Sequence, residues 1–298
     1  MYLNKLDDAM KAMYGCKVYK LALSSGCSCP NRDGSMGRRG CIFCDGAGAF
    51  AEAGEISHQL AAARLRVAAK LKKPAKYVSY FQSFTNTYAP PEVLEPMFRA
   101  AMEPEDVVAL SIATRPDCLG PEILALLERC AAVKPLWVEL GLQTVHPETA
   151  RYIRRGYDLE VYDKAVEQLK GLGATVIAHQ ILGLPGETKE MMAETSRYIG
   201  ASGADGIKLH LLHILRGTDL AREWEAGRVP VMDLDQYIEA LECCVEHLPR
   251  SLVIHRLTGD GAKRDLLAPL WSGDKKRVLN AINCAFLRDD VEQGRLYE

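Results

Sequence analysis

The sequence predicts an α/β fold, an open, partial (β/α)6 TIM-type barrel with a small C-terminal extension. Two observations predict it. Short runs rich in Val, Ile and Leu alternate with longer segments of helical periodicity, as in βα units around a parallel sheet that is buried on both faces. Polar residues also gather after the carboxyl ends of these runs, where βα barrels build their active sites.

Apolar runs at six places in the chain are the expected strands. They cover residues 17–24, 76–82, 106–114, 135–143, 174–182 and 206–214. Six βα units are too few for a closed barrel of eight strands but enough for an open one. Proline near the start of two intervening segments and glycine at the end of two others agree with the usual signals at helix ends.

We expect one domain with an extension, because no internal repeat, low-complexity tract or obvious linker interrupts the pattern. Its parts are an N-terminal segment (1–16), the barrel (17–215) and a C-terminal extension that completes the site (216–298). Within the extension the pattern predicts a helix at 232–248, a strand-like run at 251–259 and a short helix near 275–287.

The composition is that of a globular protein, with 48% hydrophobic residues among 298 and a net charge of -2. The N-terminus lacks the apolar region of a secretory signal, and no run approaches the ~20 apolar residues of a membrane helix. We therefore expect a cytoplasmic protein without a membrane partner, in which thiols stay reduced and disulfides are disfavoured. A pI of about 6.4 gives no global signature of a nucleic-acid binder.

Four of the ten cysteines fall within residues 26–45: Cys27, Cys29, Cys41 and Cys44. All four together would make a four-thiolate zinc site. Three of them, Cys29-x11-Cys41-x2-Cys44, would instead hold a [4Fe–4S] cluster with one iron open to another ligand. Both sites are compatible with the spacing alone.

The segment "KVYKLALSSGCSCPNRDGSMGRRGCIFC" resembles the YhcC/YtqA-like family of radical S-adenosylmethionine (SAM) enzymes. Further similar stretches extend over nearly the whole chain: "YVSYFQSFTNTYAP", "LSIATRPDCL", "WVELGLQTVHPETARYIRRGY", "AHQILGLPGET", "IKLHLLHILRGTDLA" and "VIHRLTGD". The resemblance implies that Cys29, Cys41 and Cys44 bind the cluster and that SAM occupies its open iron. Cys27 stands where the family usually has an apolar residue, so it is expected to be a buried neighbour.

The resemblance also implies where SAM is bound. Phe43 is the aromatic residue before the last cysteine, Ile181 would pack on adenine, and Gly183 would let the backbone approach the cofactor. "YFQSFTNT" replaces the usual GGE motif, so Gln82, Thr85 and Asn86 are either polar SAM contacts or strand-end caps. The remaining candidates for SAM binding are Arg115, which could equally form a salt bridge, Glu139, Gln143, Arg155 and His179.

Four residues are candidates for contact with the substrate. Lys208 and His210 share one face of the expected strand 206–214, whereas His213 has the opposite parity and is expected to pack outside. His255 and Arg256, from the extension, are the preferred substrate contacts.

The predicted activity is that of a radical SAM enzyme, in which a 5′-deoxyadenosyl radical abstracts hydrogen from the substrate. Such an enzyme needs an external one-electron reductant of the flavodoxin or ferredoxin type. The family is similar to the radical SAM part of the elongator catalytic subunit, which implies tRNA wobble uridine as the substrate. Because no acetyltransferase region follows, the expected reaction converts carboxymethylaminomethyl uridine to aminomethyl uridine. Basic stretches at 64–76, 151–155 and 275–277 would contact phosphates.

Alternative functions remain open at this point. A radical SAM enzyme could act on a small molecule instead of tRNA. A non-enzymatic RNA-binding protein could use all four clustered cysteines as a zinc staple. A simple iron–sulfur electron carrier would need a closed set of four ligands and would have no use for a large barrel.

Overall fold

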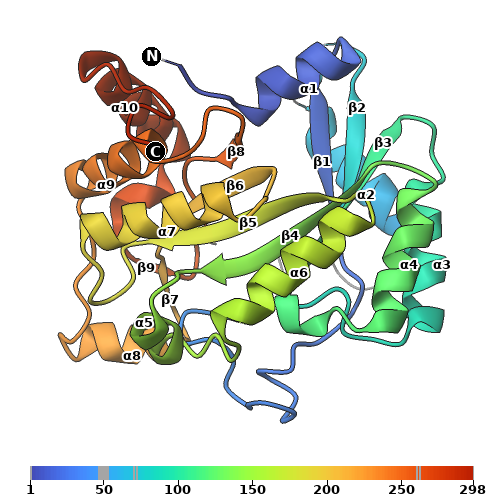
Figure 1. The fold of residues 1–298 in the computed structure, drawn as a ribbon, viewed down its shortest axis with the longest axis horizontal. Coiled ribbons are helices and arrows are strands. Elements are labelled where there is room, and N and C mark those ends of the chain that lie inside the picture. Colours follow the sequence, from blue (N-terminus) through green and yellow to red (C-terminus); the bar gives the residue numbers. More distant parts are fainter. Residues whose placement is uncertain are drawn as a thin grey trace.

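The computed structural model describes residues 2–45, 54–69, 71, 73–259, 261 and 263–297. Its centre is a seven-stranded sheet that curls into a partial barrel (Figure 1). The strands are β1 (Val18–Leu23), β2 (Lys76–Phe81), β3 (Val107–Thr114), β4 (Leu136–Gln143), β5 (Thr175–Leu182), β6 (Gly206–Leu211) and β8 (Val253–Arg256). All neighbours in this order pair in parallel, which confirms the predicted fold class.

Most helices cover the outer face of the sheet, α1 lies against its amino end, and α5 and α8 lie beside the loop that follows β1 (Figure 1). Their bounds are α1 (Leu6–Tyr14), α2 (Ile56–Ala68), α3 (Pro91–Met102), α4 (Pro121–Ala131), α5 (Pro147–Tyr152), α6 (Leu159–Gly171), α7 (Lys189–Ala201), α8 (Asp219–Glu225), α9 (Leu234–Glu246) and α10 (Lys275–Arg288). Among the described helices, none combines the length and apolarity required to cross a bilayer.

Local signals in the sequence explain where several helices begin. Proline occupies the first turn of α3, α4 and α5, where its missing N–H costs no hydrogen bond. The Asp233 side chain accepts from the N–H of Gln236, and the Gln236 side chain accepts from the N–H of Asp233, which makes a capping box before α9. These caps satisfy backbone groups that the helix itself leaves unpaired.

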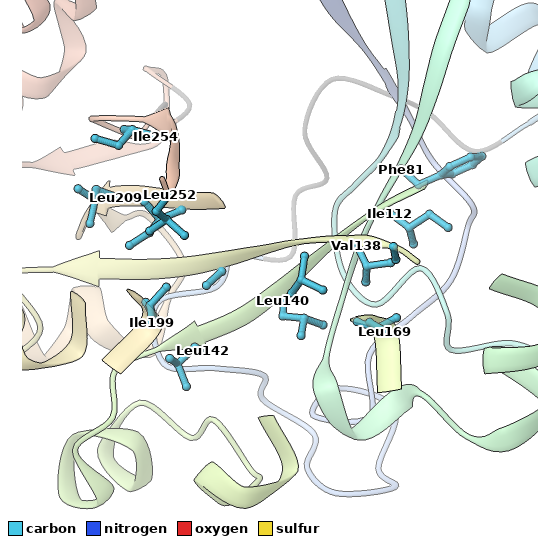
Figure 2. Packing of buried hydrophobic residues seen from close by; sticks show 14 of the residues in the cluster. Phe81, Ile112, Val138, Leu140, Leu142, Leu169, Ile199, Leu209, Leu252 and Ile254 are labelled. Carbon is cyan, nitrogen blue, oxygen red and sulfur yellow. The ribbon is translucent and has the colours of Figure 1, made fainter. Parts of the chain in front are cut away.

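The main core lies between the outer face of the sheet and the helices (Figure 2). Phe81, Ile112, Val138, Leu140 and Leu142 are fully buried there. Alternate residues of a strand point to the same face, so the intervening residues of β4, including Glu139, point into the barrel. Burial of each large apolar side chain contributes about 1.5–3 kcal/mol, which makes this layer the principal source of stability.

The inside of the barrel is built in layers along the strands. At the amino end, Met10 of α1 packs on Val78, Ala109, Trp137 and Ile177. Two residues further along each of these strands, on the same face, the side chains are polar. Lys20 of β1 and Lys208 of β6 join them, so this polar layer consists of Lys20, Tyr80, Ser111, Glu139, His179 and Lys208. It separates the apolar end from the carboxyl end of the sheet, where barrel sites are built.

The extension contributes more to the sheet than expected. The run at 251–259 forms β8, which pairs with β6 and adds a seventh strand to the predicted six. The expected strand 206–214 ends at Leu211, and Ile214 belongs to the short strand β7 (Ile214–Leu215), antiparallel to β9 (Leu266–Ala268). The N-terminal segment closes the same edge, because Ile254 N–H donates to the Asn4 carbonyl at 2.7 Å.

Candidate active site

The cysteine loop follows β1 and runs beside α5 and α8 (Figure 1). Cys29, Cys41 and Cys44 line a single cavity of about 220 Å³ at the carboxyl end of the sheet. Turns within the loop fix their spacing, since Arg32 N–H donates to the Cys29 carbonyl at 2.8 Å and Cys44 N–H to the Cys41 carbonyl at 3.0 Å. The long gap between the first two cysteines is therefore a folded turn structure.

Asn31 anchors this loop to the segment after α5. Its amide nitrogen donates to the Arg154 carbonyl at 2.8 Å and approaches Cys41 Sγ at 3.5 Å. The Ile42 carbonyl accepts from Leu220 N–H of α8 at 2.9 Å. The cysteines are thus held by elements distant in sequence, as a preorganised binding site requires.

Gly156 allows the close approach of this anchor. Its φ is +86°, and a Cβ there would lie 2.9 Å from Asn31 Oδ1. We expect Gly156→Ala to lower the free energy of unfolding by at least about 1–2 kcal/mol and to reduce cluster content by displacing Asn31. Denaturant unfolding and iron analysis measure the two effects. Gly171→Ala, a helical position with open space around it, is the control and should not destabilise; equal behaviour of the two variants would contradict the prediction.

The donor set fits a [4Fe–4S] cluster. Among the described residues, no three His, Cys, Asp or Glu side chains converge on one metal ion. A cube instead binds each thiolate at a separate iron, which suits thiols spread along one cavity wall. Burial raises the pKa of the Cys41 thiol to about 11, so binding a cluster there would release a proton.

The structure separates Cys27 from the other three cysteines. Cys27 packs against the main core and does not line the cavity. Cys118 lies in the short 3-10 helix Pro116–Cys118, and burial together with the charge of Asp117 raises its pKa to about 12. Such a thiol is a poor nucleophile at neutral pH.

Several of the predicted SAM-binding residues line the same cavity: Phe43, Thr85, Arg115, Glu139, Gln143, Arg155 and His179. Thr85 Oγ1 is buried and has no hydrogen-bond partner among the described residues. Phe84 and Gln143 adopt positive φ values of 58° and 69° at the cavity wall. Unusual backbone geometry of this kind is concentrated at functional sites, so both observations support a binding site here.

Other predicted cofactor contacts lie elsewhere. The Asn86 amide donates to the carbonyls of Ser83 and Ala113, and its oxygen accepts from Ser25 Oγ at 2.7 Å. Asn86 therefore holds the loop after β2, which agrees with the capping alternative. Gln82 lies before this loop and does not line the cavity.

The two buried arginines are largely engaged with the protein. Arg115 forms a bidentate pair with Asp117 at 2.8 and 2.6 Å, so the salt-bridge alternative is realised. Arg155 donates to the carbonyls of Thr144 at 2.7 Å and Tyr157 at 3.0 Å. Its Nη2 donates to none of the described residues. Arg155 thus retains a donor for an anionic group at the cavity.

A second cavity, of about 240 Å³, shares Phe43, Gln143 and His179 with the first. Ile181 and His210 also line it, as predicted for cavity-facing residues. His213 lines it too, so the expectation that His213 packs outside was wrong. The reason is that β6 ends at Leu211, so strand parity does not extend to His213. Gly183, with φ +85°, lines a separate cavity of about 370 Å³ beside Met232.

Glu139 is the centre of the polar layer. It is fully buried, and its carboxylate accepts from Lys20 Nζ at 2.7 Å, Tyr80 Oη at 2.7 Å, Ser111 Oγ at 3.0 Å, His179 Nε2 at 2.8 Å and Lys208 Nζ. Burial alone would raise the pKa of Glu139, but the charges of Lys20 and Lys208 outweigh it and keep that pKa well below its ordinary value. Glu139 is therefore ionised, and hydrogen bonds to its carboxylate connect β4 with β1, β2, β3, β5 and β6.

The four predicted substrate contacts fall in different places. Lys208 lies in the polar layer, where burial lowers its pKa to about 7 against the opposing effect of Glu139. His255 and Arg256 line a cavity between β8, α1 and α10, and the His255 ring packs 5.6 Å from Trp137. The structure does not bring these two residues to the cysteine cavity.

Sequence reasoning missed Lys20, Tyr80, Ser111 and Asn31. A usable signal existed for the first three, because each is a polar residue at an inward position of an otherwise apolar strand. Asn31 carried no such signal, since its role depends on a carbonyl more than a hundred residues away.

A curled parallel sheet with three thiols at its carboxyl end is the arrangement of a radical SAM enzyme. Residues 34–199 match the model of the Radical SAM superfamily, and residues 204–287 match the Radical_SAM C-terminal domain. The chain belongs to the radical SAM superfamily. This membership confirms a [4Fe–4S] cluster and SAM as its cofactors.

Within the superfamily the chain belongs to the YhcC/YtqA family. It is 39% identical to YtqA of Bacillus subtilis over 298 residues, which cover 99% of this chain and 92% of YtqA. It is 40% identical to YhcC of Escherichia coli over 270 residues, 90% of this chain and 87% of YhcC. The predicted resemblance is therefore confirmed.

More distant matches extend the comparison. The tRNA uridine(34) acetyltransferase of Methanocaldococcus jannaschii is 29% identical over 156 residues, 51% of this chain and 28% of that enzyme. The structure of Elp3 from Methanocaldococcus infernus superposes with a TM-score of 0.73 at 17% identity, covering 93% of this chain and 64% of that one. At this identity the structural match supports the fold only.

Proposed function

We propose that this radical SAM enzyme acts on the C5 side chain of the wobble uridine of tRNA, converting carboxymethylaminomethyl to aminomethyl uridine. The observation that carries the substrate is the match of half the chain to a tRNA uridine(34) acetyltransferase. The cysteine cavity supports the reaction class. A cytoplasmic location and a reductant of the flavodoxin or ferredoxin type belong to the same proposal.

In this proposal Cys29, Cys41 and Cys44 hold the cluster. When bound, the cluster and SAM supply the hydrogen-abstracting radical. Arg155 Nη2 is placed to bind a carboxylate, and Ile153 contributes to an apolar wall that excludes water from the cavity. The protein's contribution is to bind, orient and shield the reactants, as expected where the cofactor carries the difficult chemistry.

The positions of the basic stretches favour one face for tRNA. Arg154, from the stretch 151–155, contacts Asp219 at 2.6 Å, and Arg39 and Arg222 also approach this carboxylate, at 3.6 and 3.2 Å. The Arg154 carbonyl lies 3.7 Å from Cys41 Sγ, so this group of arginines around a single acid borders the cysteine loop. Excess positive charge beside the cavity would attract phosphates.

The other two stretches are less favourable for phosphate contact. Arg64, from 64–76, pairs with Asp106 at the amino end of β3, opposite the cavity. Residues 70 and 72 of this stretch lie outside the described residues. The stretch 275–277 begins α10, which borders the cavity of His255.

The direct test uses anaerobically reconstituted protein, SAM, a one-electron reductant and tRNA that carries carboxymethylaminomethyl uridine. We expect aminomethyl uridine and 5′-deoxyadenosine to appear together by mass spectrometry, and the rate to fall steeply with added salt. Formation of 5′-deoxyadenosine without a change in the tRNA nucleosides would refute the substrate. Absence of 5′-deoxyadenosine in a cluster-loaded preparation would refute the activity itself.

A further inference from the structure

His179 lies where the two cavities meet, since it lines both. Its Nε2 is 2.8 Å from Glu139 Oε2. An ionised carboxylate can only accept hydrogen bonds, so the proton of a neutral His179 must be on Nε2. Nδ1 then carries a lone pair and is an acceptor.

Glu139 keeps this arrangement fixed. Four further donors, Lys20, Tyr80, Ser111 and Lys208, hold its carboxylate in place. The same burial that surrounds Glu139 lowers the pKa of His179 to about 4. The imidazole is therefore neutral at physiological pH and has one defined tautomer.

The acceptor faces open space. Nδ1 of His179 makes no hydrogen bond to any described residue, and 18% of the side chain is exposed. The His210 ring packs at 5.1 Å, and its buried Nε2 also has no hydrogen-bond partner among the described residues. A buried imidazole nitrogen without a partner, as at His210, is costly. Together with the adjacent cavity-facing acceptor of His179, it points to a polar ligand here.

We infer that Glu139 and His179 form a substrate-positioning pair, in which His179 Nδ1 accepts a hydrogen bond from an N–H group of the substrate. The identity of the donor rests on the proposed function. It is N3–H of the wobble uracil, the only N–H of that ring. Enzymes that act on a nucleobase commonly read its pairing edge by hydrogen bonds inside a pocket. This contact would orient the C5 side chain with respect to SAM.

A cycle of one protein change and one substrate change tests the contact. The substrates are anticodon stem-loops whose modified wobble uridine carries either N3–H or N3–CH3, and the proteins are wild type and His179→Ala. We expect kcat/KM of the wild type to fall about 10- to 100-fold on N3-methylation, as for an unpaired buried group. With the unmethylated RNA, kcat/KM of His179→Ala should be lower than that of the wild type by a similar factor. Methylation of N3 should then reduce kcat/KM of this variant little further. His58→Ala, an exposed residue of α2, is the matched control and should behave as wild type.

Two further measurements separate the alternatives. The dissociation constant of SAM should change less than about twofold in His179→Ala; a tenfold increase would assign His179 to the cofactor and overturn the inference. Nitrogen NMR of labelled histidine in the reconstituted protein should show the Nε2–H tautomer for His179, and Glu139→Gln should change its signal. Observation of the Nδ1–H tautomer for His179 in the wild type would also overturn the inference.

The cycle distinguishes the two proposals. If wild type converts both stem-loops equally well, the positioning pair is refuted while the proposed function stands. If wild type cleaves SAM but converts neither RNA, the proposed function is refuted, and the uracil contact fails with it.

Discussion

Replacing any one of Cys29, Cys41 and Cys44 by serine is expected to abolish cluster binding and with it all SAM cleavage. Each thiol lines the same cavity, and a cluster with three protein ligands has no replacement for any of them. Iron and sulfide should fall from about four per chain to nearly zero. Elemental analysis and EPR of the reduced, reconstituted protein, with and without SAM, measure the result.

Cys27→Ser is the matched control, because Cys27 belongs to the same loop but packs on the main core. It should retain the cluster and an EPR signal that changes with SAM. If Cys27→Ser loses the metal as completely as Cys29→Ser, or if the wild type binds zinc through all four thiols, the three-ligand assignment is wrong. The zinc-staple alternative would then be favoured.

The second large effect is expected for Glu139→Gln. The change removes the charge that compensates Lys20 and Lys208 while it preserves side-chain size. Breaking a buried ion pair by removing one partner costs about 3–5 kcal/mol, so the free energy of unfolding should fall by that order. Denaturant unfolding measures it. Glu95→Gln is the control, because this carboxylate pairs with Arg99 and Arg129 at an exposed site, where pairing contributes little.

The pH dependence of the Glu139 variant gives an independent check. Without its counter-charge, the pKa of Lys208 should fall further below about 7. Above that pKa the folded state is deprotonated, whereas the unfolded lysine keeps its proton up to about pH 10. The unfolded state then binds more protons, so stability of the variant should rise with pH up to about 10, and the rise should begin at a lower pH than the value of about 7 expected for the wild type. A flat or falling profile would show that Lys208 is not the uncompensated charge.

Much of the fold could be predicted from residue patterns. The first five predicted strands agree with the observed ones to within one residue at each end, because a strand covered on both faces is largely apolar even where single inward positions are polar. The strand 206–214 was less accurate, since its apolar run continues past Leu211 into β7. Hydrophobic periodicity indicates which residues are buried, but it does not indicate which neighbouring strand or helix buries them.

At the cysteine site, too, part of the arrangement could be predicted from the sequence and part required the structure. Spacing left a four-thiol and a three-thiol site equally possible, and the resemblance to a family chose between them. The structure adds a physical reason: Cys27 packs on the main core, whereas the other three thiols share a cavity. Cys27 and Cys29 are two positions apart in the sequence, but in the folded loop Cys27 packs on the core whereas Cys29 lines the cavity.

By itself, the sequence determined the class of this protein: a parallel βα architecture, a loop with four clustered cysteines and, through resemblance, the YhcC/YtqA family. Only the tertiary structure decided which polar groups act together. Lys20, Tyr80, Glu139, His179 and Lys208 come from five strands spread over most of the barrel sequence, and one carboxylate unites them. Apolar burial is a property of single segments and can be read locally. A hydrogen-bonded charge network depends on which strands the folded sheet brings together.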